Sequence, residues 1–169
     1  MHHPLELFRY CPKCGSELFE VHNIKSKHCS NCGFTYYQNP SSATAAFILN
    51  SKGELLVVRR AKDPAKGTLD LPGGFVDNDE TGEQGIIREI KEETGLDVKN
   101  IEYLFSSPNG YMYSGMGVHT LDMDFLVRVH CDAIPIKASD DAAEAIWIPI
   151  NKVNPVSYTH LTLPTTPYV

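Results

Sequence analysis

Three glutamates stand close together in the stretch REIKEETGL of residues 88–96, at Glu89, Glu92 and Glu93. On a helix that turns by about 100° per residue, their carboxylates fall within one arc of about 100°, where like charges repel by about a few tenths of a kcal/mol per pair. Such a face is either solvated, the commonest state of glutamate, or it holds a hard cation such as Mg²⁺ or Mn²⁺, which prefers carboxylate oxygen. Taken alone, the cluster favours the solvated face.

Four of the five cysteines form two matched pairs, with the spacing C-x2-C-x14-C-x2-C at Cys11, Cys14, Cys29 and Cys32. Four thiolates at this spacing are typical of a closed tetrahedral Zn²⁺ site, which is structural because no coordination position is open. The segment is too small to fold on its own core, so we expect the metal to supply its folding free energy. Two disulfides or a redox C-x-x-C are the alternatives, and the matched pairs favour zinc over both. Cys131 stands alone, and we expect a thiol without a partner.

Charge is unevenly distributed along the 169 residues. Residues 1–40 hold four Lys/Arg and three Asp/Glu, a net charge of +1, and residues 41–154 hold eleven and eighteen, a net charge of −7. An acidic main domain argues against general electrostatic capture of nucleic acid. The sequence has no run of 18 apolar residues, so no membrane span is expected. The N-terminus lacks the pattern of a secretion signal. We therefore expect a cytoplasmic protein.

The elements that must position the glutamates are predicted to be a mixed sheet with one helix on it. The helix is expected over 82–95, ended by Gly95, with Ile86, Ile87 and Ile90 packed on the sheet and the carboxylates facing outward. The predicted strands are 43–49, 54–60, 98–107, 119–130 and 146–150, with extended chain over 69–76. The loops expected to carry further functional residues are 108–117 and 138–145.

The glutamates belong to a longer pattern that begins at Gly74 and ends at Leu96. It is G-x5-E-x7-R-E-U-x-E-E-x-G-U, where U is a bulky aliphatic residue, and every fixed position over these 23 residues agrees. This pattern resembles the signature of Nudix hydrolases, and the strand order around it is also similar, over residues 41–154. The resemblance implies an α/β fold, the Nudix α/β/α sandwich with a mixed sheet, here preceded by a small zinc ribbon.

The same resemblance implies roles for the matching residues. The implied ligands of Mg²⁺ or Mn²⁺ are Glu89, Glu92, Glu93 and the carbonyl of Gly74. Arg88 would hold the glutamates by ion pairing, which its planar fork suits, and Glu80 would be an outer support or a ligand through water. The metal would neutralise a diphosphate and lower the pKa of the attacking water. A carboxylate would then remove the proton. Glu89 is one candidate base, and Glu144 in the predicted loop 138–145 is another, with a surface charge as its alternative.

The resemblance specifies a metal-dependent hydrolase that cleaves nucleoside diphosphates linked to a group X: a dinucleotide, ADP-ribose, a nucleotide sugar or a modified nucleoside triphosphate. The zinc ribbon is similar to that of NADH pyrophosphatases, but their array S-Q-P-W-P-F-P-x-S is here SSPNGYMYSGMGVHT, without Trp or Phe. This departure argues against NADH specificity. Tyr111 and Tyr113 are candidates for stacking on a base, with packing between strand ends as the alternative, and Arg59 is a candidate for binding phosphate.

Three segments are therefore expected: a zinc ribbon over 1–40, a Nudix hydrolase domain over 41–154 and a tail over 155–169. The tail PVSYTHLTLPTTPYV has no charged residue and resembles a translated sequencing adapter, so we interpret it as non-native, with the family's closing helix missing by truncation.

A small nucleotide is the expected partner, nucleic acid is less favoured, no membrane is expected, and a homodimer stays open. The alternative function is a non-catalytic regulator that senses a metabolite and binds nucleic acid through the ribbon.

Overall fold

A computed structural model describes residues 3–61, 66–113, 115–130 and 142–153 of the chain. Two compact units are formed. The first comprises Met1–Ser41 and Pro108–Leu121, and the second comprises Ser42–Ser107 and the described residues from Asp122 onward. Among the described residues, no helix has the length and apolar character needed to cross a membrane. Cys131 and the tail 155–169 lie outside the described residues.

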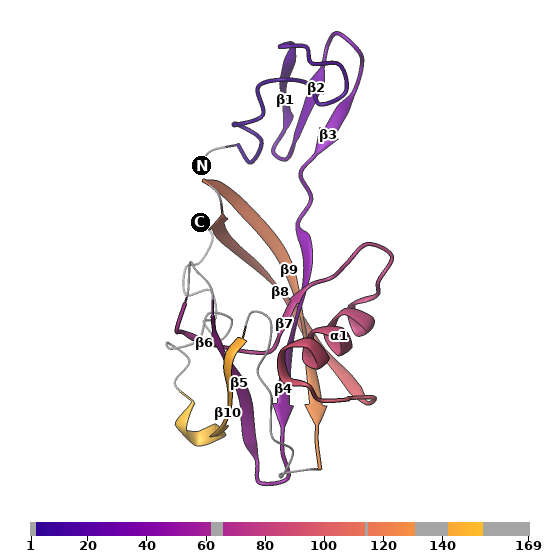
Figure 1. The fold of residues 1–169 in the computed structure, drawn as a ribbon. Helices are drawn as coiled ribbons and strands as arrows, with labels where there is room; N and C mark the ends of the chain where they lie inside the picture. Colours follow the sequence, from indigo (N-terminus) through magenta and orange to yellow (C-terminus); the bar gives the residue numbers. More distant parts are fainter. Residues whose placement is uncertain (1–2, 62–65, 114, 131–141, 154–169) are drawn as a thin grey trace. The chain divides into compact units, whose positions relative to one another are not determined.

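The first unit contains a small antiparallel sheet in the order β1-β2-β3 (Figure 1). Its strands are β1 (Phe19–Asn23), β2 (Ser26–Cys29) and β3 (Thr35–Tyr37). Phe19 packs with two of the paired cysteines, Cys11 and Cys29, in a core to which Phe8 and Phe34 add partly buried rings. So few apolar side chains bury little surface, as expected for a segment that needs a further source of stability.

The larger sheet has seven strands in the order β10-β5-β4-β9-β8, with β6 beside β5 and β7 beside β4 (Figure 1). Its strands are β4 (Ser41–Leu49), β5 (Glu54–Arg60), β6 (Leu69–Asp70), β7 (Gly73–Phe75), β8 (Ile101–Tyr113), β9 (Met116–Arg128) and β10 (Ala142–Pro149). β5 pairs antiparallel with β4 and β10, whereas β4 and β9 point the same way (Figure 1). The predicted α/β class with a mixed sheet is therefore confirmed.

Helix α1 (Gly82–Thr94) begins and ends at clear sequence signals. Thr81 Oγ1 accepts from the backbone N–H of Gln84 at 3.2 Å, and the Gln84 side chain accepts from the N–H of Thr81 at 2.8 Å. These two bonds satisfy donors that a helix start otherwise leaves unpaired. Gly95 adopts φ 74° and caps the last turn, a conformation that favours glycine. The helix predicted over 82–95 is confirmed.

The main core lies between α1 and the sheet. Ile86 and Ile90 are fully buried there, and each such side chain contributes about 1.5–3 kcal/mol through burial. Along β5 the side chains alternate between faces. Leu56 points to the α1 side, and Leu55 and Val57 point to a second apolar cluster with Leu71. The sheet thus buries both faces and fixes α1 by one of them.

The sequence predicted two loops where the structure has mainly strand. The loop expected over 108–117 is largely strand, because β8 continues to Tyr113 and β9 begins at Met116. Pro108 is tolerated because β8 ends the strand order and is an edge strand, where a missing N–H is least costly. The described part of the loop expected over 138–145 is strand as well, so Glu144 lies in β10, opposite Arg59 of β5.

Candidate active site and metal centres

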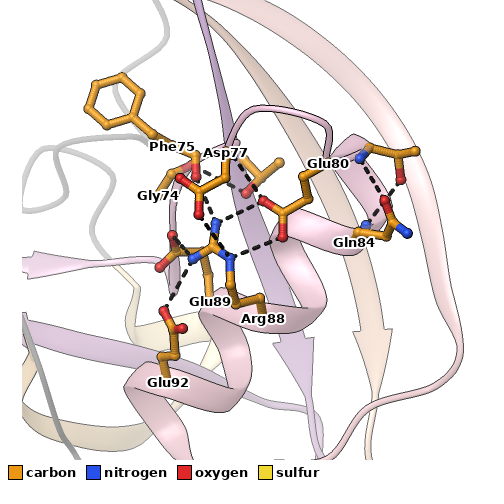
Figure 2. Close-up of polar contacts among 10 residues, drawn as sticks. Gly74, Phe75, Asp77, Glu80, Gln84, Arg88, Glu89 and Glu92 are labelled. Carbon is orange, nitrogen blue, oxygen red and sulfur yellow. Dashed lines mark hydrogen bonds and ion pairs between the residues drawn. The ribbon is translucent and has the colours of Figure 1, made fainter.

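Arg88 lies at the centre of a group of carboxylates on α1 and the loop before it (Figure 2). Its Nε and Nη2 donate to the two oxygens of Glu80 at 3.0 and 2.9 Å, a two-point contact that the planar guanidinium favours. Its Nη1 donates to Glu89 at 2.7 Å and to Glu92 at 3.1 Å. We call Glu80, Arg88, Glu89 and Glu92 the Arg88 cluster. One cation therefore holds three carboxylates that would otherwise repel each other.

Glu89 lies against the backbone of Gly74. A Cβ added at Gly74 would stand 2.6 Å from Glu89 Oε1, so any side chain there would fill the space that the carboxylate occupies. The Gly74 carbonyl accepts from Thr44 Oγ1 at 3.3 Å, which ties this turn to β4. Two residues that the sequence assigned to one metal site thus lie in contact.

Glu93 is placed differently from the other two glutamates. The sequence predicted that it faces outward, but it is only 8% exposed. Its Oε2 accepts from the backbone N–H of Gly73 at 3.1 Å, because the start of β7 lies against that flank of α1. The Gly73 donor offsets part of the cost of burying this carboxylate. Glu93 therefore joins the helix to the turn that carries Gly74.

The charge of this region favours a cation. Asp77 adds a further carboxylate, 3.8 Å from Arg88 Nε. Four carboxylates thus surround one guanidinium, those of Asp77, Glu80, Glu89 and Glu92, and Glu93 adds a fifth negative charge on the same helix. An excess of negative charge with only oxygen donors fits Mg²⁺ or Mn²⁺ in kind and in charge. In the described part of the chain, Glu89, Glu92 and Glu93 do not form a set with oxygens within 4.8 Å of one another. Glu89 and Glu92 bond Arg88, and Glu93 bonds Gly73.

The Arg88 cluster also shifts pKa values. Hydrogen bonds from Arg88, and then from the backbone of Asp77, hold the pKa of Glu80 below its ordinary value. The hydrogen bonds to Glu80, followed by those to Glu89, raise the pKa of Arg88 above its ordinary value. Both shifts favour the charged forms. The cluster is therefore a persistent ion-pair network at neutral pH.

The four paired cysteines converge as predicted. Their sulfur atoms all lie within 4.8 Å of one another. The Sγ atoms of Cys11 and Cys32 are 3.7 Å apart, and so are those of Cys14 and Cys29. A disulfide would require about 2.05 Å, whereas the edge of a tetrahedron with Zn–S bonds of about 2.3 Å is about 3.8 Å. The spacing therefore fits one Zn²⁺ and excludes disulfides between these two pairs.

Cys14 is suited to metal binding by its ionisation as well. The backbone of Ser16 and then the side chain of Asn31 donate to its sulfur and lower the pKa of Cys14 to about 6. The thiolate is the form that binds metal. The lowered pKa therefore favours the thiolate form of Cys14 at neutral pH.

Arg59 and Glu144, predicted separately for phosphate binding and for catalysis, contact each other. Arg59 Nε and Glu144 Oε2 are 3.1 Å apart, and Arg59 Nη1 donates to the Gly67 carbonyl at 2.9 Å. Their side chains are 39% and 54% exposed, so solvent weakens the pair. The sequence did not anticipate this contact because it placed Glu144 in a loop rather than opposite Arg59 in the sheet.

The predicted tyrosines belong to the first unit. Tyr111 lies in β8 and is 38% exposed, and the side chain of Tyr113 lies outside the described residues.

The sequence reading overlooked Phe75, which follows Gly74 and is 48% exposed. Its carbonyl accepts from Arg88 Nη2 at 3.0 Å, and its ring points away from the Arg88 cluster (Figure 2). The available signal was an aromatic residue that follows two glycines and precedes an acidic loop.

Comparison with known proteins gives consistent matches. The family model that describes the NUDIX domain matches residues 39–166. The ADP-ribose pyrophosphatase of Methanocaldococcus jannaschii is 34% identical over 129 residues, which cover 75% of this chain and 72% of that protein. The NAD-capped RNA hydrolase NudC of Vibrio vulnificus is 30% identical over 157 residues, which cover 93% of this chain and 57% of that protein. The chain thus spans little more than half the length of this second relative.

A similar fold is found in the crystal structure of a MutT/nudix family protein from Enterococcus faecalis. The two structures match with a TM-score of 0.57 and 30% sequence identity, over 66% of this chain and 44% of that chain. The likeness in fold therefore accompanies a likeness in sequence.

Proposed function

The chain belongs to the NUDIX family of hydrolases, and from that premise we propose that it cleaves the diphosphate linkage of a nucleoside diphosphate joined to a group X, with Mg²⁺ or Mn²⁺ as cofactor. The observation that carries the proposal is the Arg88 cluster, which holds Glu89 against Gly74 within a complete G-x5-E-x7-R-E-U-x-E-E-x-G-U motif. A structural helix face would not need three carboxylates around one guanidinium.

In this proposal the residues divide the work. Glu89, Glu92 and Glu93, with the Gly74 carbonyl, would hold the cation, which when bound would supply positive charge to the diphosphate and activate the attacking water. Arg88 and Glu80 keep the helix and loop in register. Glu89 would accept the proton of the water as general base. Glu144 is the alternative base, and its release from Arg59 would then have to accompany substrate binding.

The substrate is proposed from the relatives and from one exposed ring. The similarity to an ADP-ribose pyrophosphatase and to an NAD-capped RNA hydrolase supports ADP-ribose or a dinucleotide as the first candidates. Aromatic rings stack on bases of any sequence. We therefore assign base stacking to Phe75, whose ring is 48% exposed, and keep Arg59 as a further substrate contact. The roles of Tyr111 and Tyr113 stay predictions from the sequence.

The proposal includes a structural zinc ribbon over residues 1–40, held by Cys11, Cys14, Cys29 and Cys32, ahead of a hydrolase domain over 41–154. The sulfur spacing described above supports the zinc assignment. A cytoplasmic location stays a prediction from the sequence, and the oligomeric state stays open.

The proposal is tested by hydrolysis of a panel of ADP-ribose, dinucleotides, nucleotide sugars and oxidised nucleoside triphosphates, with and without Mg²⁺. We expect Mg²⁺-dependent release of a nucleoside monophosphate from at least one diphosphate-linked compound. Glu92→Gln and Glu93→Gln should each lower turnover by more than about a hundredfold, since loss of a direct ligand exceeds the effect of an outer support. Glu83→Gln, an exposed glutamate of the same helix, is the matched control. Full activity in both variants would refute the assignment.

A further inference from the structure

Asp70 is a buried carboxylate that ends β6, directly before the turn of the proposed metal site. It is 3% exposed. Its Oδ2 accepts from Arg60 Nη1 at 3.0 Å, and its Oδ1 accepts from the backbone N–H of Leu71 at 3.0 Å. A buried carboxylate is tolerated when a charged partner and a hydrogen bond compensate for lost water. Arg60 therefore supplies a positive charge that helps to keep Asp70 inside the protein as an anion.

The backbone of Arg60 bonds the two residues that lead into β6. Its N–H donates to the Thr68 carbonyl at 3.0 Å, and its carbonyl accepts from the N–H of Gly67 at 2.9 Å. Side chain and main chain of one residue thus fix both ends of β6. By the alternation of β5, Arg59 points to the other face of the strand, where it pairs with Glu144. The two adjacent arginines have separate partners.

From Asp70 the chain reaches the proposed site in three residues, and each step is bonded. Leu71 is buried in the second apolar cluster, the Pro72 carbonyl accepts from the N–H of Ala46 at 2.9 Å, and the Gly73 N–H donates to Glu93 at 3.1 Å. A Cβ at Gly73 would lie 2.1 Å from the Thr44 carbonyl oxygen. Because residues 71–73 are each held by a contact, a shift of Asp70 would be passed along the backbone to Gly73.

We propose that Arg60 and Asp70 form a positioning pair that holds Pro72 and the start of β7 against Glu93 and Glu89, and so sets the affinity of the site for a divalent cation. The inference rests on the proposed function, because it assumes that this site binds the cation. Neither residue reaches the cation or the substrate in the proposal. Their effect passes through the Gly73–Glu93 bond and through the contact of Gly74 with Glu89.

The test is a titration of the full chain with Mn²⁺. Binding is measured by calorimetry or by the electron paramagnetic resonance signal of free Mn²⁺. Arg60→Gln leaves Asp70 buried without its cation, so we expect Mn²⁺ affinity to fall by about tenfold or more, the size seen when an outer support of a metal site is lost. Arg60→Lys keeps the charge and should stay within about threefold of wild type, because one ammonium can still pair with Asp70. Lys99→Gln, an exposed charge on the loop after α1, is the control.

A double variant separates positioning from general loss of stability. Arg60→Gln with Asp70→Asn removes both charges, so we expect it to bind Mn²⁺ more tightly than Arg60→Gln alone, a non-additive result that two independent effects would not give. If Arg60→Gln does not fold, Asp70→Asn and Arg60→Lys are compared instead, with weaker binding expected only in Asp70→Asn. Equal Mn²⁺ affinity in wild type and the folded Arg60 and Asp70 variants would overturn the inference alone. Absence of Mn²⁺ binding in wild type would overturn the proposed function as well.

Discussion

At the scale of single residues, the account depends on side chains that each make more than one contact. Arg88 is the clearest case, because its guanidinium reaches Glu80, Glu89, Glu92 and the carbonyl of Phe75. Lysine could satisfy only part of this set, since it lacks the planar fork. The identity of residue 88 is therefore explained by geometry as well as by charge.

Phe75 gives a test of substrate binding that leaves the metal site intact. Replacing Phe75 by leucine keeps an apolar side chain and the backbone carbonyl that accepts from Arg88, but it removes the ring. Stacking on a base contributes about 1–3 kcal/mol, so we expect KM to rise by about tenfold with kcat nearly unchanged. Steady-state kinetics on the best substrate of the panel measures both. An unchanged KM would show that Phe75 does not contact the base.

Glu80 predicts a dependence of stability on pH. Its pKa is lowered in the folded state by Arg88, so the pair stabilises the fold above the ordinary glutamate pKa of about 4.3 and this contribution is lost as pH falls through the lowered value. Glu80→Gln should therefore melt below wild type at pH 7, and the difference in Tm should shrink below pH 4.3 or so. Melting curves of both proteins, with Glu83→Gln as control, provide the measurement. A Tm difference independent of pH would contradict the assigned ion pair.

At the scale of elements, the turn between β6 and β7 is the least tolerant part of the site. Gly73 has φ 155°, and a Cβ there would collide with backbone of β4 at 2.1 Å. Gly95 also needs a positive φ, but a Cβ there would meet nothing within 4 Å. Gly95→Ala should therefore cost about 1–2 kcal/mol from backbone strain alone. Gly73→Ala should cost more, because a strand must also move. Urea denaturation of both variants checks the order, and equal losses would contradict the clash.

The sequence predicted the parts of the fold that local signals determine. Helix α1 was predictable because Thr81, Gln84 and Gly95 carry capping chemistry and the isoleucines repeat at helical spacing. Strands β4 and β5 were predictable from their apolar runs and the turn between them. The chemical identity of the site followed from the spacing of its glutamates, and the sulfur cluster from the spacing of its cysteines.

The features that the sequence did not predict depend on neighbours far along the chain. Whether Pro108 ends a strand depends on its place at a sheet edge, which only the strand order reveals. Glu144 was taken for a loop residue because its pairing with Arg59 spans distant segments. The burial of Glu93 follows from the turn at Gly73 lying on that flank, a packing detail that helical angles alone do not contain.

At the scale of the whole molecule, the proposed zinc site predicts that the two compact units differ in their source of stability. The first unit has a small core, so chelation of Zn²⁺ should unfold β1, β2 and β3, because metal-binding free energy is folding free energy in such modules. The second unit, with its sheet and α1, should stay folded. Amide spectra of the labelled protein before and after chelation, together with zinc content per chain, make the measurement. A Cys131→Ser variant should behave as wild type.

Retention of β1, β2 and β3 after complete removal of metal would argue against the zinc assignment. Disulfides among the four paired cysteines, detected by mass spectrometry of the purified protein, would also argue against the zinc assignment, because cysteines that form disulfides cannot bind the metal as thiolates.

The central claim is that the carboxylates of α1 hold a divalent cation against a diphosphate, and a crystal soaked with Mn²⁺ and a non-hydrolysable analogue of ADP-ribose tests it most directly. We predict an anomalous-scattering peak between α1 and Gly74, within about 2.0–2.3 Å of carboxylate oxygens from Glu89 and at least one of Glu92 and Glu93, and in contact with the diphosphate. A well-ordered analogue bound without any such peak, or a peak bound elsewhere on the protein, would contradict the account.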